Sequence, residues 1–412
     1  MKKTFTSIFL VLGLLSLAQA QNTITHDLIM WTTGMHTLWD GNQALYYGFG
    51  EGSFAPPQFP GPILYANEGD TMVINVRNQS QGAPHTIHWH GLDVDQENDG
   101  VPQTSYVIYH QEDTFYKFVA PHAGTYLYHC HVASVVHVQL GMYGTVIIRP
   151  ADGGNTAWTG GPSYSKEYNW LMSEFDKTWH DSVPNHHAAD TSLPYFAIPP
   201  YIPDYFMVNG QSRQQLSDTN TAVAAKVGEK VYLRLSNIGF YINKIAFPSH
   251  LDAQIISSDG RPLPNSLDQD TLWLTPGERY GVMLTPSIEL DDSIAVSYIN
   301  PNTYQNWNTE QVPLSINGIV GLPEPESREL ELSVFPNPNR GKFTLLNHGV
   351  TGTPLQIEVI DMQGRIITEM TWGNPIIGGH FEVTLPEIPA GIYSLKCRTK
   401  TGSSRTKLSI SK

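Results

Sequence analysis

Two short clusters of histidine, one of which includes a cysteine, stand out in the first half of the chain. The first cluster reads His85-Thr86-Ile87-His88-Trp89-His90-Gly91. The second reads His129-Cys130-His131 and is followed by His137 and Met142. Imidazole nitrogens and a thiolate sulfur are ligands for copper and other borderline transition metals. A lone His is usually a surface or core residue, but the conjunction of residue type, order and spacing predicts that this chain binds copper.

The alternation of side chains along a β-strand sorts these residues into two groups. Residues an even number apart in a strand share a face, and residues an odd number apart point to opposite faces. His85 is an odd number of residues from both later His of its cluster, and Cys130 stands opposite its two neighbours. Parity therefore places His85 and Cys130 together. The other group, called the four-His group below, consists of His88, His90, His129 and His131.

The group of His85 and Cys130 is completed by residues further along the chain. We expect a loop after the second cluster to bring His137 and Met142 back to Cys130. Two His, one Cys and a weakly bound Met are the ligand set of a type 1 copper centre. The four-His group suits copper or another borderline metal, and the peptide links beside Cys130 would give a short electron path between the two sites. A structural zinc site also uses Cys and His, but it explains neither Met142 nor the four-His group.

The clusters lie in a region whose pattern indicates β-sheet. Within residues 22–150, short stretches alternate apolar and polar residues as half-buried strands do: residues 71–77, 115–118, 125–128 and 144–148. Glycines and a proline between residues 153 and 162 mark a linker. Below, residues 22–150, which include both clusters, are called the first domain.

Two further modules follow the first domain. Residues 165–321 contain more short stretches of strand character: residues 231–235, 253–257, 280–284 and 294–298. Residues 321–327 form a second linker, and residues 330–412 a third module of short strands. We find no long helical periodicity, and we expect His186 and His187, in a polar stretch, to lie in a loop. The chain is therefore predicted to be all-β.

Composition narrows the class of protein. The 412 residues are 40% hydrophobic and 15% charged, which indicates a globular chain. The net charge of −14 argues against nucleic acid as a partner, because phosphate binding needs basic patches. Only two cysteines are present, Cys130 and Cys397, so the chain does not rely on disulfides. A single Cys between two His then needs another explanation than a bridge.

Residues 1–20 have the features of a signal peptide. Lys2 and Lys3 form a basic start, an apolar stretch follows over residues 8–18, and Ala18-Gln19-Ala20 is a small-x-small cleavage site. A membrane anchor is the alternative, but the apolar stretch is short for a span. No Cys follows the cleavage site, so lipid attachment there is not indicated. We expect Sec-dependent export.

Residues 22 to about 321 resemble the multicopper oxidase family of cupredoxin-fold proteins. Residues 88–92, 99–104 and 124–129 look like motifs of that family's first domain. The spacing within the first cluster, and the run from His129 to Met142, look like the copper-bearing last domain of its three-domain members. Here both patterns sit in one domain. The resemblance implies two cupredoxin-like Greek-key β-sandwich domains.

The resemblance also implies a role for each ligand. Four residues would bind a type 1 copper: His85, Cys130, His137 and Met142. His88 would serve a type 2 copper. The remaining three would serve a type 3 pair: His90, His129 and His131.

This chain departs from the family pattern in two ways. The six residues between Cys130 and His137 make a spacing longer than is usual in multicopper oxidases and shorter than in copper nitrite reductases. A trinuclear cluster in this family also needs twice as many His as the four-His group supplies. The second domain, over residues 165–321, has no His-x-His pair; its His residues are His180, His186, His187 and His250. Three hypotheses remain open: a homo-oligomer in which two first domains face each other, a mononuclear type 2 site, or a filled type 1 site alone.

The resemblance implies a laccase-like oxidase. A small-molecule or metal-ion reductant would give electrons to the type 1 copper, and oxygen would be reduced to water at the four-His group. Among the acids Asp93, Asp95, Glu97 and Asp99, the last is the candidate to relay protons or to orient ligands. A copper nitrite reductase is the rival enzyme. An exported copper-binding or electron-transfer protein is the non-enzymatic rival.

Residues 330–412 resemble the C-terminal sorting domain of the type IX secretion system. The matching motifs occur in order at residues 335–343, 357–364, 389–393 and 407–412. The resemblance implies the type IX machinery as a partner and export across an outer membrane, with release or attachment at the cell surface. A plain β-sandwich adhesion module is the alternative. Cys397 would then be a small core residue.

Overall fold

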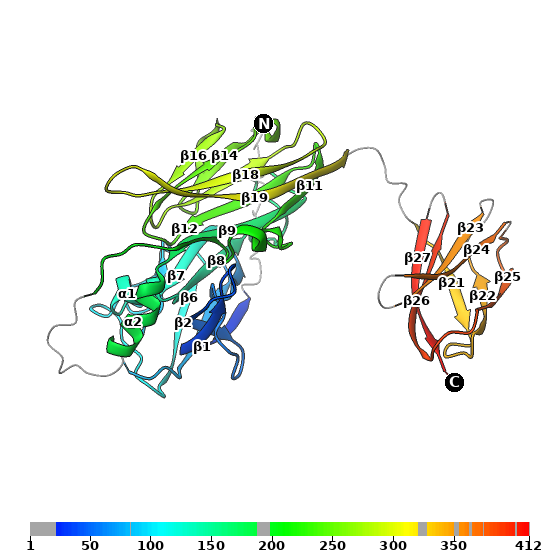
Figure 1. Cartoon of the computed structure of the whole chain (residues 1–412), viewed down its shortest axis with the longest axis horizontal. Coiled ribbons are helices and arrows are strands. Elements are labelled where there is room, and N and C mark those ends of the chain that lie inside the picture. The colour runs from blue at the N-terminus through cyan, green and yellow to red at the C-terminus, as the bar shows by residue number, and fades with distance from the viewer. Residues whose placement is uncertain are drawn as a thin grey trace, which may run out of the picture. The chain divides into compact units, whose positions relative to one another are not determined.

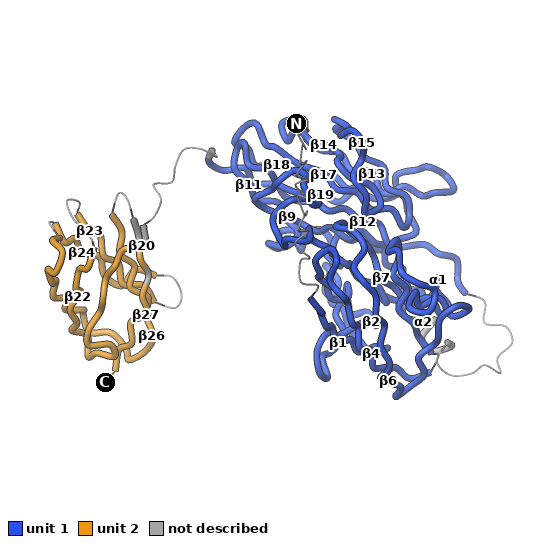
Figure 2. The backbone as a smooth tube through the Cα atoms, turned by 180° about the vertical axis from the view of Figure 1, so that it is seen from behind, with its two compact units in different colours: residues 1–319 blue, residues 320–412 orange. Residues whose placement is uncertain are grey.

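The computed structural model of the chain divides into two compact units, residues 1–319 and residues 320–412, which Figure 2 distinguishes by colour. The described residues are 22–82, 84–187, 198–319, 328–349, 354–361, 365–373, 375–399 and 402–411. The signal peptide expected over residues 1–20 and the linker expected over residues 321–327 lie outside them. None of the described helices is long and apolar enough to cross a membrane.

The first domain is built from two four-stranded sheets. One sheet has the order β2 (Gln43–Glu51), β1 (Thr23–Thr37), β4 (Thr71–Asn78) and β6 (Asp113–Val119). The other has the order β3 (Leu64–Asn67), β8 (Tyr143–Arg149), β7 (Gly124–His129) and β5 (His88–His90). In β4 the buried side chains Met72, Ile74 and Val76 alternate with more exposed ones, as the sequence pattern predicts. They pack in one core with Trp89 and Val146 of the other sheet, so the two sheets form a β-sandwich.

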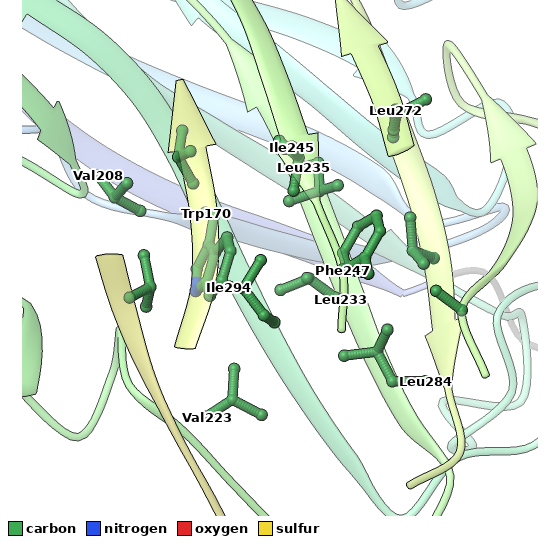
Figure 3. Packing of buried hydrophobic residues seen from close by; sticks show 14 of the residues in the cluster. Trp170, Val208, Val223, Leu233, Leu235, Ile245, Phe247, Leu272, Leu284 and Ile294 are labelled. Atoms are coloured by element: carbon green, nitrogen blue, oxygen red, sulfur yellow. The ribbon is translucent and has the colours of Figure 1, made fainter. Parts of the chain in front are cut away.

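The second domain also pairs two sheets. Its six-stranded sheet has the order β10 (Tyr205–Val208), β9 (Lys166–Phe175), β12 (Val231–Asn237), β17 (Arg279–Leu284), β14 (Gln254–Ser258) and β15 (Arg261–Asp268). Its five-stranded sheet has the order β11 (Val223–Val227), β19 (Asn306–Ile319), β18 (Leu290–Ile299), β13 (Ile242–Ala246) and β16 (Thr271–Leu274). Figure 3 shows Trp170 and Leu233 of the first sheet packed with Ile245 and Ile294 of the second. Two short 3₁₀ turns, Arg213–Ser217 and Ser249–Leu251, complete the domain.

The two domains share polar contacts within the first compact unit. Arg234 Nη1 of β12 donates to Thr125 Oγ1 of β7 at 3.0 Å. Arg261 Nη2 of β15 forms an ion pair with Asp93 at 2.5 Å. In Figure 1, β7 and β12 lie close together at the junction of the domains. The second domain therefore lies against the part of the first domain that carries the His and Cys clusters.

Residues 328–411, with their gaps, form the second compact unit. A five-stranded sheet has the order β20 (Arg328–Glu329), β27 (Gly402–Ile410), β26 (Gly391–Arg398), β23 (Leu355–Ile360) and β24 (Ile366–Trp372). A three-stranded sheet has the order β21 (Leu332–Phe335), β22 (Lys342–Asn347) and β25 (His380–Thr384). Both sheets contribute to one core, in which Cys397 of β26 is buried.

The prediction of an all-β chain is confirmed, with two α-helices as local exceptions among the described residues. Helix α1 (Ser134–Gln139), which contains His137, lies in the segment between Cys130 and Met142 where the sequence predicts a loop. Helix α2 (Lys177–His187) includes the backbone of His186 and His187, so the prediction of a loop there is wrong. The physical reason lies at the start of the helix, where Asp176 Oδ1 accepts the backbone N–H of buried Trp179 at 3.2 Å. Capping and the burial of one aromatic residue thus stabilise a helix whose sequence is mostly polar.

Candidate metal centres

Three side chains of the predicted type 1 group converge in the interior of the first domain. Cys130 Sγ lies 3.2 Å from His137 Nδ1 and 3.6 Å from His85 Nδ1, and the two Nδ1 atoms are 3.3 Å apart. All three side chains are buried. One soft sulfur and two imidazole nitrogens facing one another at these distances are a donor set that fits copper. We call His85, Cys130, His137 and Met142 the type 1 group.

Local backbone structure brings these residues together from separate elements. Cys130 directly follows β7. His85 precedes β5, and its backbone N–H and C=O form hydrogen bonds with the backbone of Ile108 at 3.1 and 2.8 Å. Ala133, in the left-handed conformation at φ 43°, turns the chain into α1, which carries His137. The structure thus replaces the expected loop by a single short helix.

Met142 is held beside these ligands by its backbone. Its N–H donates to His137 O at 2.9 Å, and its carbonyl accepts the Cys130 N–H at 3.0 Å. The side chain is fully buried in the core of the first domain. These two hydrogen bonds close the chain segment that begins at Cys130 and fix where Met142 lies.

Thr86 links the type 1 group to the four-His group. Its Oγ1 accepts the His131 N–H at 3.0 Å, and both its backbone and its hydroxyl favour the ionised form of the neighbouring Cys130 thiol. Burial raises the pKa of the Cys130 thiol to about 12, against this effect of Thr86. A bound metal ion would hold this sulfur as the thiolate.

The four-His group assembles on the facing ends of β5 and β7. His88 and His129 are direct partners across the antiparallel ladder. His90 Nδ1 lies 3.4 Å from His129 Nε2, and ligand atoms of all three rings lie within 4.8 Å of one another. His131 stands at the margin, with its ring centroid 5.1 Å from that of His88. The structure therefore brings three of the predicted ligands together and places the fourth beside them.

Burial keeps two rings of this group neutral. It lowers the pKa of His129 to about 3 and the pKa of His90 to about 4. A neutral imidazole has a nitrogen lone pair available, which is the form that binds a metal ion. The rings are therefore in their ligand form at neutral pH.

Asp99 is the acid that reaches the four-His group. Its backbone carbonyl lies 2.9 Å from His88 Nδ1, and its carboxylate oxygen lies 3.2 Å from the same nitrogen. Gly100 permits this approach, because its φ is +69° and a Cβ there would lie 1.8 Å from Ile87 O. Burial raises the pKa of the Asp99 carboxyl. Asp93, in contrast, pairs with Arg261, and Asp95 accepts hydrogen bonds from Asn98.

The described His side chains of the second domain lie outside the four-His group. His250 is in a 3₁₀ turn, 4.0 Å from Asp292. His180 is fully buried near α1, and its ring stacks on Phe175. The side chains of His186 and His187 lie outside the described residues. Among the described side chains, the clusters that could hold a metal thus come from the first domain.

Two contacts of these sites have no signal in the sequence. The first is between His90 and a turn of the second domain at Gly277 and Arg279. The second joins His180 of α2 to the segment that carries His137. His180 Nδ1 lies 2.6 Å from Leu45 O, and its Nε2 lies 2.9 Å from Gln139 O. Both contacts depend on how the second domain packs against the first, which no local motif encodes.

We expect replacement of His180 by Phe to destabilise the copper-free protein most strongly above pH 6.5. Burial lowers the pKa of His180 from 6.5 to about 3, so the folded protein keeps the ring neutral. The neutral ring carries one proton, so it donates either from Nδ1 to Leu45 O at 2.6 Å or from Nε2 to Gln139 O at 2.9 Å. Losing this buried hydrogen bond costs about 1–3 kcal/mol of unfolding free energy. Chemical denaturation at pH 7 measures the difference.

The pH dependence identifies the cause. Below pH 6.5 the unfolded chain protonates His180 and the folded protein does not until pH approaches 3, so the stability contributed by the ring is lost as pH falls. The difference between wild type and His180→Phe should therefore shrink from pH 7 to pH 4. The other His residues are common to both proteins and cancel. A difference that stays constant over this range would show that the ring is not held neutral.

Comparison with known proteins gives family matches for three regions of the chain. Residues 54–153 and residues 166–309 match two family models, each described as multicopper oxidase, and residues 333–411 match a secretion system C-terminal sorting domain. An L-ascorbate oxidase from Cucurbita pepo var. melopepo is 26% identical over 298 residues, which are 66% of this chain and 52% of that protein. The chain spans about half or less of the length of the first curated relatives that it matches.

Solved structures give the same picture. A blue copper oxidase from Nitrosomonas europaea is similar with a TM-score of 0.56 and 27% identity, over 72% of this chain and 86% of that one. A copper nitrite reductase from the same organism shares the fold, with a TM-score of 0.54 and 18% identity over 72% of this chain and 94% of that one.

The match to the sorting domain points to type IX secretion and so to an extracellular or cell-surface location. The family of the first two matches binds copper, and the donor atoms of both clusters fit that metal. The two domains over residues 54–153 and 166–309 therefore belong to the multicopper oxidase family, and the chain ends in a secretion system C-terminal sorting domain.

Proposed function

We propose that the protein is an exported copper oxidase that takes electrons from a reductant at the type 1 group and reduces oxygen to water at the four-His group. The observation that carries this proposal is the position of Cys130 between the two groups. Its sulfur faces His85 and His137, while its neighbour His129 faces the other His cluster. One peptide link thus separates a thiolate ligand from an imidazole ligand.

Bound copper supplies one-electron redox chemistry at both sites. The chain's own contribution is to hold the donor atoms close together and away from water. Cys130 and His137 are fully buried, and His129 is nearly so. His129 Nδ1 also lies 3.0 Å from Cys130 O, which adds a hydrogen-bonded path to the covalent one. We infer that electrons move along this segment from the type 1 group to the four-His group.

The reductant would approach through helix α1. Val135 is 57% exposed on this helix and stands two residues before His137. An apolar side chain at this point suits an organic donor such as a phenol or an amine, and a metal ion is the inorganic alternative. The reductant would meet the protein surface at Val135, close to His137, so it would not need to enter the core.

Asp99 would hold and deliver protons for water formation. Its carboxylate contacts His88 and keeps 26% of its side-chain surface exposed. A carboxyl group whose pKa is raised by burial exchanges protons more readily near neutral pH than an ordinary Asp. Asp99 would therefore carry protons between solvent and the four-His group.

Copper content and electron acceptor separate this proposal from its rivals. The measurement is copper per chain, together with oxygen consumption and nitrite consumption in the presence of a phenolic donor. An oxidase gives more than one copper per chain and consumes oxygen. A copper nitrite reductase, whose fold this chain shares, consumes nitrite and not oxygen. About one copper per chain, with no consumption of either acceptor, identifies an electron carrier.

A homo-oligomer is the proposal for completing the second site. The four-His group offers half of the His that a trinuclear cluster of the family uses, and symmetric self-association of first domains would double that number. Copper-loaded protein should then sediment as an oligomer that dissociates when His88 is replaced. A monomer that carries the full copper complement would contradict this arrangement and favour a mononuclear site.

The export route completes the proposal. Residues 1–20 would direct Sec-dependent passage across the inner membrane, before the C-terminal sorting domain directs type IX secretion. Copper loading and catalysis would then take place outside the cell. Loss of residues 1–20 should leave the protein in the cytoplasm, which fractionation and immunoblotting detect.

A further inference from the structure

Helix α1, which carries the type 1 ligand His137, is too short to be stable by itself. Its six residues include three valines, a β-branched residue with low helix propensity. Ala133, at its N-cap, makes no side-chain capping bond. An isolated helix shorter than about 12–15 residues is at best marginally stable in water, because its first turn is costly to form. The position of His137 must therefore depend on contacts between α1 and other parts of the chain.

The second domain packs against the end of α1 that follows His137. Val138 lies in one apolar cluster with Leu171 of β9 and Ile238, which follows β12. The next residue, Gln139, is buried, and its side-chain Nε2 donates to a backbone carbonyl of β9 at 3.3 Å. The second domain thus supplies both an apolar and a polar contact to this end of the helix.

His180 of α2 lies between α1 and β2. Its Nε2 is 2.9 Å from Gln139 O, and its Nδ1 is 2.6 Å from Leu45 O of β2. The residue is 1% exposed, and its ring stacks on Phe175. A neutral imidazole has one N–H, so it donates to one of these two carbonyls. The ring therefore fills the space between the helix and the strand and supplies a hydrogen-bond donor there.

Helix α1 and strand β2 also define the surroundings of His137. Tyr47 of β2 lies with its ring centroid 6.0 Å from that of His137. The backbone N–H of Tyr47 donates to Leu140 O, at the end of α1, at 2.8 Å. Because His180 contacts the same strand and the same helix, it keeps His137 packed against Tyr47.

We propose that the second domain holds the ligand His137 in place by anchoring α1 through His180, although none of the type 1 group belongs to that domain. His180 is a positioning residue, because its ring contacts Gln139 and Leu45, which are not copper ligands. Without this anchor His137 can move relative to Cys130, which changes the geometry of the donor atoms. The proposal rests on the proposed function only in taking the type 1 group as a copper site.

Hydrogen exchange in the full-length, copper-free protein tests the anchor without any metal. In His180→Phe the ring still stacks on Phe175, but it has no N–H for either carbonyl. We expect the backbone amides of residues 136–142 to exchange about 10-fold faster than in the wild type, because a buried hydrogen bond is lost. His180→Gln, whose side-chain amide can donate, should restore part of the protection. Val138→Ala weakens the apolar part of the same contact and should also speed this exchange.

His250→Phe is the matched control. His250 is also a mostly buried His of the second domain, with 12% of its side chain exposed, but its ring faces Asp292 of β18. This variant should keep the wild-type exchange rates of residues 136–142. Equal rates in the wild type and in His180→Phe overturn the proposal, and so does an equal increase in His180→Phe and His250→Phe.

Copper loading tests the consequence for the type 1 group. His180→Phe should bind copper at this group about 10-fold more weakly and shift the energy of the thiolate absorption, whereas His250→Phe should match the wild type. Unchanged affinity and absorption in His180→Phe overturn the proposal even if α1 exchanges faster. A wild-type protein that binds no copper at the type 1 group contradicts the proposed function instead, and the exchange rates then decide whether His180 anchors α1.

Discussion

Replacing Cys130 by Ser is expected to abolish the intense visible absorption of a copper–thiolate bond and to stop electron entry. The hydroxyl is a poor substitute for a thiolate, because soft sulfur ligation defines this type of copper site. Loss of an outer partner of a metal ligand already costs about 10–100-fold, so loss of the ligand itself should lower turnover by more than about 100-fold. Visible spectroscopy and oxygen uptake with a phenolic donor measure the two effects.

Cys397→Ser is the control for this experiment. Cys397 is also buried, in β26 of the second compact unit. Its replacement should leave the visible absorption and the turnover at wild-type values. Persistence of the absorption band in Cys130→Ser would show that another sulfur binds the metal and would contradict the assigned type 1 group.

Replacing His88 by Ala is expected to separate the two sites. His88 is the ring that contacts Asp99, His90, His129 and His131. Its loss should remove copper from the four-His group. Oxygen consumption should fall by more than about 100-fold, because losing a ligand should cost more than losing a hydrogen-bond partner of a ligand. The thiolate absorption should remain, because the type 1 donor atoms come from other residues. Copper analysis, visible spectroscopy and oxygen uptake on one preparation measure all three.

His122→Ala is the matched control, since His122 belongs to the same domain but its half-exposed ring faces Glu68 and Asp93. This variant should match the wild type in copper content and oxygen uptake. Unchanged oxygen uptake in His88→Ala would show that the acceptor is reduced elsewhere. Simultaneous loss of the thiolate band would show that the two sites do not fill independently.

The grouping of ligands could be predicted from sequence because it depends on local geometry. Alternation along the chain separates His85 from His88, and Cys130 from its neighbours, whichever partner strand is present. The structure brings His85 together with Cys130, although both lie just outside strands β5 and β7. It also brings His88 together with His90 and His129, and leaves His131 beside them. The position of Asp99 is also local in origin, since Gly100 allows the close approach to His88.

The remaining features depend on packing between distant segments. Arg279 lies far along the chain from His90, and its contact with Gly91 exists only because β17 of the second domain reaches the end of β5. Helix α2 was missed because its sequence is mostly polar and contains Pro184, although Asp176 before it is a capping signal that could have been used. His180 was then left without a role, whereas the structure places it against the segment that carries His137.

One measurement tests most directly whether the two groups act as a connected pair. The copper-loaded protein is reduced without oxygen until the thiolate absorption is bleached, and oxygen is then admitted while the band is followed in a stopped-flow instrument. We expect the band to return within the turnover time, because electrons would leave Cys130 through His129 to the four-His group. A band that stays bleached under oxygen, or that returns only when nitrite is added, would contradict the assignment of oxygen as the acceptor.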